Sequence, residues 1–284
     1  MQFFLAVFKC LRFLPRPLLK VLAFLLGDLL FWLSAERRRV AQYNIDIAFP
    51  EKSASARYHI LRRHFRYFVM TLLDHAYIWF GSEAQLKKLI RIEGMETLPD
   101  TPSLWFAPHF LGLDAGGMRM AIDHKMVAMY VTQKNPVFDK MLKESRQRFI
   151  PSCMVSRQDG ARALIKAFRD GYQLHYSPDQ DFGDRDAIFV PFFGKPAATV
   201  TAMPRLAQVT RTTVVPVITT MEKDGYTVRF QPAWDNYPSG NIEADTRRMN
   251  AWLEDMIRQY PEQYFWLHKR YKTRPKGEKN PYKK

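Results

Sequence analysis

A histidine and an aspartate five positions apart, His109 and Asp114, are the residues of this chain best suited to catalysis. Residues 103–106 before them are apolar and strand-like, and residues 114–122 can form a helix, so His109 is expected in the turn at the carboxyl end of a strand. An aspartate in the first helical turn can hold one imidazole nitrogen, which leaves the other as a base towards a hydroxyl group. The alternative is a turn histidine capped by a nearby carboxylate, because short motifs often match by chance.

Short apolar runs alternate with helical patterns beyond residue 102, which is typical of an α/β fold. The predicted strands are residues 103–106, 126–131, 153–155, 173–176, 213–221 and 226–231. The predicted helices are residues 53–80, 114–122, 136–149, 160–169, 199–210 and 244–260. A Lys223-Asp224-Gly225 turn predicts a hairpin between the last two strands. The sheet is therefore expected to be mixed, mostly parallel and flanked by helices. Three histidines of the first helix, His59, His64 and His75, are interpreted as packing or surface residues.

Three polar residues near the helix of residues 136–149 are candidates for substrate binding, namely Asn135, Arg146 and Arg148. This helix follows a predicted strand, so these side chains are expected near the same sheet edge as His109. Arginine suits phosphate because its planar group can donate two hydrogen bonds. The alternative is a solvated basic helix face.

The segment Asp179-Gln180-Asp181 follows another predicted strand and is a second candidate for substrate binding. Its carboxylates can bind a sugar hydroxyl, position Arg146 or cap a turn. Residues 188–194 are too apolar for a surface loop. They are expected either to line an acyl channel or to pack beneath the site.

The first forty residues favour contact with a membrane. Residues 3–14 and 18–33 are two apolar runs separated by prolines, and neither reaches the roughly 20 clean apolar residues of an ordinary spanning helix. Trp32 and the basic residues 37–39 resemble an interfacial anchor for anionic headgroups. Whether this element spans the bilayer or lies in one leaflet stays open, and so does the alternative of an apolar helix packed on a soluble domain.

Composition limits the partners. The net charge of +15 over 284 residues favours an anionic partner, such as nucleic acid, acidic phospholipid, a phosphorylated glycolipid or an acidic carrier protein. Only two cysteines occur, Cys10 and Cys153, and no Cys/His cluster has metal-ligand spacing, so neither a disulfide scaffold, a metal nor a cofactor is expected. Residues 269–284 contain eight Lys or Arg against one Glu and are expected to form a mobile basic tail.

Several motifs along the chain accompany the spacing of His109 and Asp114. They are Arg37-Arg38-Arg39 with Asn44 and Phe49-Pro50, Gln133-Lys134-Asn135, Arg146-Gln147-Arg148, Pro178-Asp179-Gln180-Asp181-Phe182-Gly183, Phe189-Val190-Pro191-Phe192-Phe193-Gly194, Ala198-Thr199, Val215-Pro216 and Gln263-Tyr264-Phe265-Trp266-Leu267-His268-Lys269-Arg270. Together they resemble the lipid A late acyltransferases, a branch of the glycerolipid-type acyltransferases that share a His-x4-Asp/Glu motif. Some members of that branch have Glu in place of Asp114, and either carboxylate can orient a histidine.

The resemblance implies a glycerol-3-phosphate acyltransferase-like fold. It implies a membrane anchor over residues 1–40, an acyltransferase domain over residues 41–268 and the basic tail over residues 269–284. It also implies that His109 and Asp114 catalyse transfer of a fatty acyl chain (C12 to C14) from an acyl carrier protein thioester to a hydroxyl of a Kdo-bearing lipid A precursor, with no covalent enzyme intermediate. The implied site is the cytoplasmic face of the inner membrane.

Two other functions stay open at this point. One is acyl transfer to another glycolipid or to a lysophospholipid. The other is a non-catalytic basic protein that binds a membrane or nucleic acid. Nucleic acid is not expected as the partner, because the aromatic residues lie mainly in apolar runs and do not alternate with the Lys and Arg of the tail.

Overall fold

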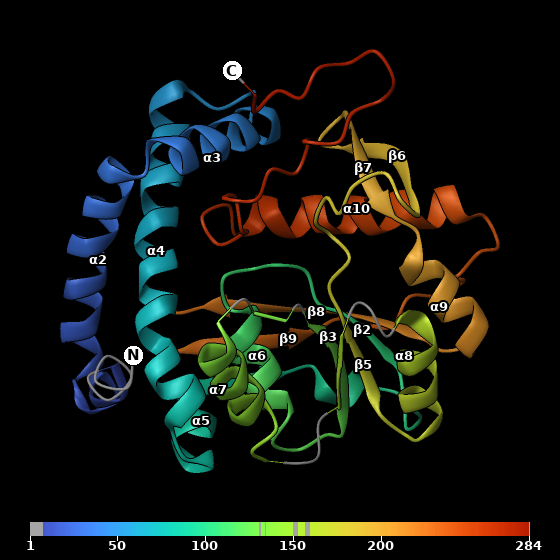
Figure 1. Cartoon of the computed structure of the whole chain (residues 1–284), viewed down its shortest axis with the longest axis horizontal. Coiled ribbons are helices and arrows are strands. Elements are labelled where there is room, and N and C mark those ends of the chain that lie inside the picture. The colour runs from blue at the N-terminus through green and yellow to red at the C-terminus, as the bar shows by residue number, and fades with distance from the viewer. Residues whose placement is uncertain (1–7, 131, 134, 150–152, 157–159, 284) are drawn as a thin grey trace.

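A seven-stranded sheet with helices on both faces forms the body of the protein (Figure 1). The computed structural model describes residues 8–130, 132–133, 135–149, 153–156 and 160–283. The strand order is β1-β9-β8-β2-β5-β3-β4, and all neighbouring strands are parallel except β8 and β9. The strands of this sheet are β1 (Ile90–Glu93), β2 (Leu104–Phe106), β3 (Met126–Tyr130), β4 (Cys153–Ser156), β5 (Gln173–Tyr176), β8 (Val214–Met221) and β9 (Tyr226–Phe230). A separate antiparallel hairpin is formed by β6 (Ala187–Phe192) and β7 (Lys195–Val200).

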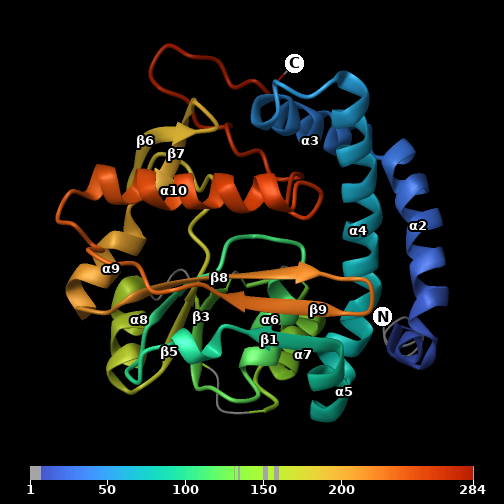
Figure 2. The same cartoon turned by 180° about the vertical axis from the view of Figure 1, so that it is seen from behind.

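Helices cover both faces of the sheet, as the two opposite views show (Figures 1 and 2). The helices are α2 (Arg16–Leu33), α3 (Ala35–Ala48), α4 (Ala54–Phe80), α5 (Glu83–Leu89), α6 (Leu113–Met120), α7 (Pro136–Arg146), α8 (Gly160–Arg169), α9 (Ala202–Thr210) and α10 (Ile242–Gln259), with short 3-10 turns at Leu11–Phe13 and Met95–Thr97. Polar caps define several helix starts. Ser53 accepts a hydrogen bond from the Ala56 backbone N at the start of α4, and Asn241 accepts one from Ala244 at the start of α10.

The central strands are buried on both faces, which explains their continuous apolar sequences. Leu104 and Phe106 of β2 pack into the core beneath α10, whereas Trp105 between them points into the opposite core, which also contains residues of α4 and α6. Side chains alternate across a strand, so one short apolar run supplies both cores. The sheet therefore holds the residues after β2 at a fixed place.

The predicted fold class is confirmed, and all six predicted strands are present. The predicted hairpin is also present, because Glu222 donates its backbone N–H to Gly225 between β8 and β9. Three strands were not predicted: β1, β6 and β7. The predicted helix of residues 199–210 begins only at Ala202, since the residues before it belong to β7.

The residues expected to form a mobile tail are instead packed on the protein. Arg270 is buried and donates to the Ala198 carbonyl and the Thr199 hydroxyl, and Tyr271 donates to the Phe192 carbonyl. The expectation of a free basic strip is therefore wrong for this part of the tail.

At the N-terminal end, α2 lies alongside α4 (Figures 1 and 2). Within the described residues, no individual helix meets the length and hydropathy expected of a membrane span. The pair formed by α2 and α3 meets them only when taken together, and these two helices are bent by 95°. The first seven residues of the predicted anchor lie outside the described part of the chain.

Candidate active site

His109 lies in the turn after β2, and its partner is Asp179, in the turn after β5. The imidazole Nδ1 of His109 is 2.7 Å from Oδ1 of Asp179, and the backbone N–H of His109 donates to Oδ2 of the same carboxylate at 3.1 Å. The register of the sheet explains this pairing. Phe106 of β2 pairs with Tyr176 of β5, so the two site residues each stand three positions beyond paired residues of adjacent parallel strands. The prediction that His109 stands at the carboxyl end of a strand is confirmed.

The Asp179 carboxylate is fully buried and holds its charge through its partners. Tyr264 donates its hydroxyl to Oδ2 of Asp179 at 3.1 Å, in addition to the two bonds from His109. Burial alone would raise the pKa of Asp179, but the neighbouring His109 and its two hydrogen bonds outweigh burial and keep this pKa below its ordinary value. Burial also raises the pKa of the Tyr264 hydroxyl well above its ordinary value, so Tyr264 stays a donor. Asp179 therefore presents an ionised acceptor to His109.

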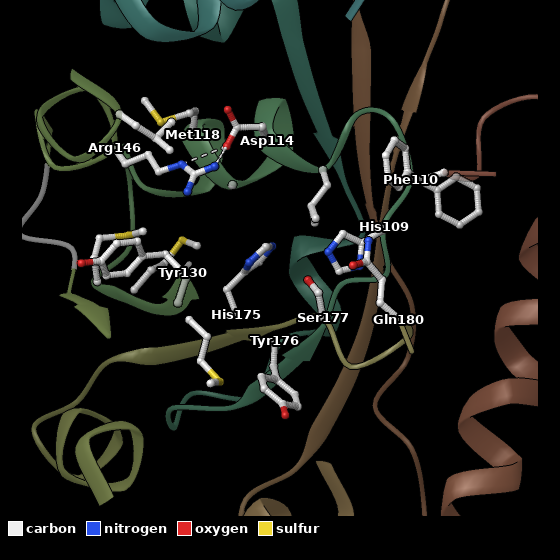
Figure 3. Close-up of a pocket in the computed structure, with 18 of the residues that line it drawn as sticks. His109, Phe110, Asp114, Met118, Tyr130, Arg146, His175, Tyr176, Ser177 and Gln180 are labelled. Atoms are coloured by element: carbon white, nitrogen blue, oxygen red, sulfur yellow. Dashed lines mark hydrogen bonds and ion pairs between the residues drawn. The ribbon is translucent and has the colours of Figure 1, made fainter. Parts of the chain in front are cut away.

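The expected contact between Asp114 and His109 is not present in the described structure. Asp114 lies in the first turn of α6, and its Oδ1 accepts from Arg146 Nε at 3.1 Å and Nη2 at 2.6 Å. Its Oδ2 accepts from the Trp79 indole at 3.0 Å and lies 3.2 Å from Nε2 of His75. The spacing prediction failed here because α6 turns this carboxylate towards α4 and α7, where Figure 3 shows it bonded to Arg146 and away from His109. The acceptor for His109 comes instead from the turn after β5.

The charge of Asp114 is well compensated. Its burial would raise the pKa of the carboxyl, but the Arg146 guanidinium and the His75 and Trp79 donors hold that pKa well below its ordinary range. Arg146 and Asp114 thus form a fixed ion pair with the guanidinium partly exposed, at 29% of its side-chain surface. Both residues line the same cavity as His109.

Two glycines allow α6 to stand close enough to the sheet to hold Asp114 in this place. A Cβ at Gly116 would lie 1.9 Å from the Thr219 hydroxyl of β8, and one at Gly112 would lie 2.6 Å from the Thr219 carbonyl. Any side chain at either position would push the start of α6 away from β8. The motif between the histidine and the aspartate is therefore shaped by packing as well as by chemistry.

A cavity of about 710 Å³ opens beside His109, within the usual range of ligand pockets. Its polar residues include His109, Asp114, Arg146 and Gln180, and 27% of the His109 side chain is exposed. Gln133, Arg185 and Asp186 also line the cavity, and most of the remaining wall is apolar and rich in methionine: Leu113, Met118, Ala121, Met126, Ala128, Met129, Leu142, Met154, Leu164 and Leu206. Methionine adapts to irregular apolar shapes. Such a cavity fits a flexible hydrocarbon chain with its reactive end at His109.

His175 of β5 stands in the cavity wall between these polar groups (Figure 3). Its Nε2 is buried and has no hydrogen-bond partner among the described residues. Burial, together with the nearby Arg146 charge, lowers the pKa of His175 to about 4, so the ring is neutral at physiological pH. His175 thus adds a polar but uncharged group to the wall of the cavity.

Four of the predicted substrate-binding residues lie away from the cavity wall. Asn135 caps α7, where its side chain accepts from the Val137 and Phe138 backbone. Arg148 donates to the Gly81 and Ile78 carbonyls at the end of α4. Asp179 holds His109. The buried Asp181 accepts from the Thr273 backbone and hydroxyl and from the Gly183 backbone, so it anchors the tail.

The apolar residues 188–194 form most of β6 and the turn after it. Val190 and Phe192 are buried, and Phe192 belongs to the core beneath α10. No residue of this stretch lines the described cavity. Of the two readings left open by the sequence, packing is the one that the structure supports.

Sequence reasoning missed three residues that support the site, namely His75, Trp79 and Tyr264. The first two lie one turn apart on α4, and this spacing places both on the face that meets Asp114. The four-residue spacing shows that the two side chains share a face of α4, but the sequence does not show that this face meets Asp114 of α6. Tyr264 lies 85 residues from Asp179, and no spacing rule connects them.

Comparisons with known proteins identify the family of this chain. Residues 1–273 match the family model for bacterial lipid A biosynthesis acyltransferases. The lipid A biosynthesis lauroyltransferase of Escherichia coli K12 is 31% identical over 93% of this chain and 88% of that protein. A Haemophilus influenzae lipid A biosynthesis acyltransferase is 31% identical over 97% of this chain and 91% of that protein. The lipid A biosynthesis myristoyltransferase of E. coli K12 is 32% identical over 89% of this chain and 80% of that protein.

Among solved structures, the 1-acyl-sn-glycerophosphate acyltransferase PlsC from Thermotoga maritima is similar, with a TM-score of 0.40 and 15% identity over 84% of this chain and 95% of that one. The family match extends over nearly the whole chain and includes every residue that surrounds the cavity. The chain belongs to the bacterial lipid A biosynthesis acyltransferase family and is an acyltransferase of lipid A biosynthesis.

Proposed function

We propose that this acyltransferase moves a lauroyl or myristoyl chain from an acyl carrier protein thioester to a hydroxyl of a Kdo-bearing, phosphorylated lipid A precursor. The observation that carries the proposal is the hydrogen bond between His109 and Asp179 at an apolar cavity. The donor and acceptor classes rest on the family, and the net charge of +15 suits two acidic partners.

His109 acts as the general base in this proposal. Because its Nδ1 proton is held by Asp179, the lone pair of Nε2 is available to the acceptor hydroxyl. The proton moves to Nε2 as the hydroxyl oxygen attacks the thioester carbonyl carbon. The carbon–sulfur bond then breaks, and the departing thiolate takes the proton from His109. An ester and a free thiol result, and no covalent enzyme intermediate is needed.

Asp114 acts indirectly in this scheme. Its carboxylate fixes Arg146, whose guanidinium faces the cavity, and a fixed arginine fork can bind an acceptor phosphate or stabilise charge that develops on the thioester oxygen. Gln180, which also lines the cavity, is proposed to contact the acceptor sugar. The catalytic contribution predicted for Asp114 is therefore proposed to pass through Arg146.

The experiment is acyl transfer by the purified protein, with acyl carrier protein donors of different chain length and the phosphorylated Kdo-bearing precursor as acceptor. Mass spectrometry should find one added lauroyl or myristoyl chain, and His109→Ala should lower turnover about 100- to 10,000-fold while the fold is retained. A folded His109→Ala protein with near-normal turnover would refute the mechanism. Preferred acylation of lysophosphatidate would instead identify the other acceptor class.

The reaction is proposed to take place at the cytoplasmic face of the inner membrane. Trp32 near the end of α2 and the exposed Arg37 and Arg39 of α3 suit an anionic lipid surface. Comparing lipid A from cells with and without the protein tests the pathway assignment directly. Unchanged lipid A would contradict it.

A further inference from the structure

The exposed face of α2 carries a continuous apolar strip. Among the described residues, twelve large hydrophobic side chains are exposed, and eight of them lie between residues 13 and 33. We call these eight residues the α2 strip: Phe13, Leu18, Val21, Leu25, Leu26, Leu29, Trp32 and Leu33. Their exposed fractions run from 38% to 73%. A concentration of this kind marks a surface that is covered in the working protein.

The opposite face of α2 is already used by the protein. Leu19, Ala23, Gly27 and Phe31 are buried, and their spacing of four residues places them on one side of the helix. A Cβ at Gly27 would lie 2.6 Å from Cα of Arg66, so the backbones of α2 and α4 are in close contact there. The helix is a fixed part of the fold along its whole length.

The charged groups of α2 strengthen this attachment. Asp28 accepts two hydrogen bonds from Arg62 and two from Arg66, and these arginines hold the pKa of its carboxyl well below the ordinary value. Near the other end, Arg16 pairs with the buried Asp74 at 2.9 Å. Both ionised groups face α4, and none of the residues in the strip is charged.

This arrangement is incompatible with α2 as a membrane span. If α2 crossed the bilayer as it is seated, α4 would enter the hydrocarbon with it, together with Arg62, Arg63 and Arg66. Several charged side chains at that depth are too costly for a stable arrangement. Only one face of α2 is available to lipid.

We propose that α2 lies in the plane of the membrane and dips the α2 strip into one leaflet, so that the whole described chain stays on one side of the bilayer. The inference rests on the proposed function only for the identity of the membrane. Cations at both ends of the helix favour an anionic lipid surface over an apolar protein partner: Lys9 is exposed before it, and Arg37 and Arg39 are exposed after it.

The packing of α2 on α4 also brings the membrane close to the active-site cavity. Arg62, Arg66 and Asp74 on one side of α4 hold α2, while Phe68 and Leu72 on another side line the active-site cavity. A single helix, α4, about 10 Å in diameter, thus separates α2 from the active-site cavity. An amphiphilic acceptor in the same leaflet is therefore held close to His109.

Vesicle binding tests the surface. Full-length protein with Leu25→Glu and Leu29→Glu should bind phosphatidylglycerol-containing vesicles at least about tenfold more weakly, since each leucine loses its apolar contact with lipid. Val209→Glu on α9 is the matched control, because Val209 is equally exposed but lies at the opposite end of the molecule (Figure 1). Equal vesicle binding by the natural protein, the double variant and the Val209→Glu control would overturn the proposal. Binding is measured without turnover, so this result is independent of the proposed function.

Cysteine labelling tests the in-plane orientation. Native Cys10 precedes α2 and is exposed, so a protein with Cys153→Ala carries one reporter before the helix. A second protein, with Cys10→Ala, Cys153→Ala and Asp224→Cys, places the reporter in the exposed β8–β9 turn of the catalytic domain. A membrane-impermeant maleimide applied to inverted and to right-side-out membrane vesicles should label both reporters from the same side. Labelling of Cys10 from the opposite side, or from neither side, would overturn the proposal.

Discussion

Replacing Asp179 by Asn is the most direct test of the catalytic geometry. The Asp179 carboxylate accepts three hydrogen bonds, from His109 Nδ1, the His109 backbone and the Tyr264 hydroxyl. An asparagine has one acceptor oxygen and one donor nitrogen in the same space. If its oxygen faces Nδ1, its NH₂ group meets the His109 backbone N–H. If it is turned round, it donates to Nδ1 and moves the ring proton to Nε2, the atom that must act as base.

The expected magnitude follows from this conflict. A wrong tautomer abolishes general-base function, and the loss of an orienting carboxylate in a comparable triad lowers kcat about 10,000-fold. We therefore expect kcat to fall about 1,000- to 10,000-fold for Asp179→Asn, with little change in KM. Tyr264→Phe leaves the carboxylate and both His109 bonds in place, so its loss should stay below about tenfold.

Steady-state transfer from an acyl carrier protein thioester to the phosphorylated precursor is the assay, with thermal unfolding as the check on folding. Asp114→Asn is the comparison that decides between the two carboxylates. If Asp179→Asn keeps kcat within tenfold of the natural protein while Asp114→Asn abolishes turnover, Asp114 orients the base and the reasoning from the observed hydrogen bonds is refuted.

Three further predictions concern packing, chain length and pH. Arg148→Lys should lower the free energy of unfolding by about 1–3 kcal/mol, because a lysine ammonium keeps the charge but lacks the planar fork that donates to both carbonyls at the end of α4. It should change kcat/KM equally for phosphorylated and dephosphorylated acceptors, and a loss confined to the phosphorylated acceptor would place Arg148 in the substrate site. Ala128→Leu narrows the apolar cavity and should favour donors with a shorter acyl chain, with the preference changing by about fourfold per methylene in a competition between mixed donors. An unchanged preference would place the acyl chain outside this cavity. Burial lowers the pKa of His64 from 6.5 to about 4, so the unfolded chain binds the proton first, and His64 by itself contributes a loss of stability of about 1.4 kcal/mol per unit as pH drops through that window. His64→Asn keeps a donor for the Glu262 carbonyl and should flatten this slope in denaturant titrations at several pH values, and an unchanged slope would contradict the assignment.

Much of the sheet could be predicted because its central strands are apolar runs bounded by turn residues. The missed hairpin shows the limit of that rule. Pro191 of β6 and Pro196 of β7 argue against strands in the sequence, yet these two residues pair directly. In the described structure the hairpin has two strands only, so the N–H group that each proline lacks is not needed to pair with a third strand. Strand β1 was missed for another reason: its partner β9 begins at residue 226, far along the chain.

The N-terminal segment shows the same limit for helices. Hydropathy predicted a membrane-associated element but left open whether it spans the bilayer. That question depends on Asp28. In the sequence it is a charged residue inside an apolar run, which only weakens the case for a membrane-spanning helix. In the structure it is bonded to Arg62 and Arg66, more than thirty residues away, and it fixes the helix to the catalytic domain. The position of one carboxylate on the helix face, not the mean hydropathy, separates the two readings.

The proposed catalytic pair, His109 and Asp179, shows the limit of local spacing rules. Asp114 is five residues from His109, and a local rule must choose it over Asp179, which is seventy residues away. Both carboxylates end near the same cavity, because strand-end turns of a parallel sheet converge there. Which of them meets the imidazole depends on the β2–β5 register and on the direction in which α6 leaves the sheet, and both are properties of the assembled fold. The spacing of the motif therefore identifies the histidine that lies at the cavity, while its hydrogen-bond partner is set by strands that become neighbours only on folding.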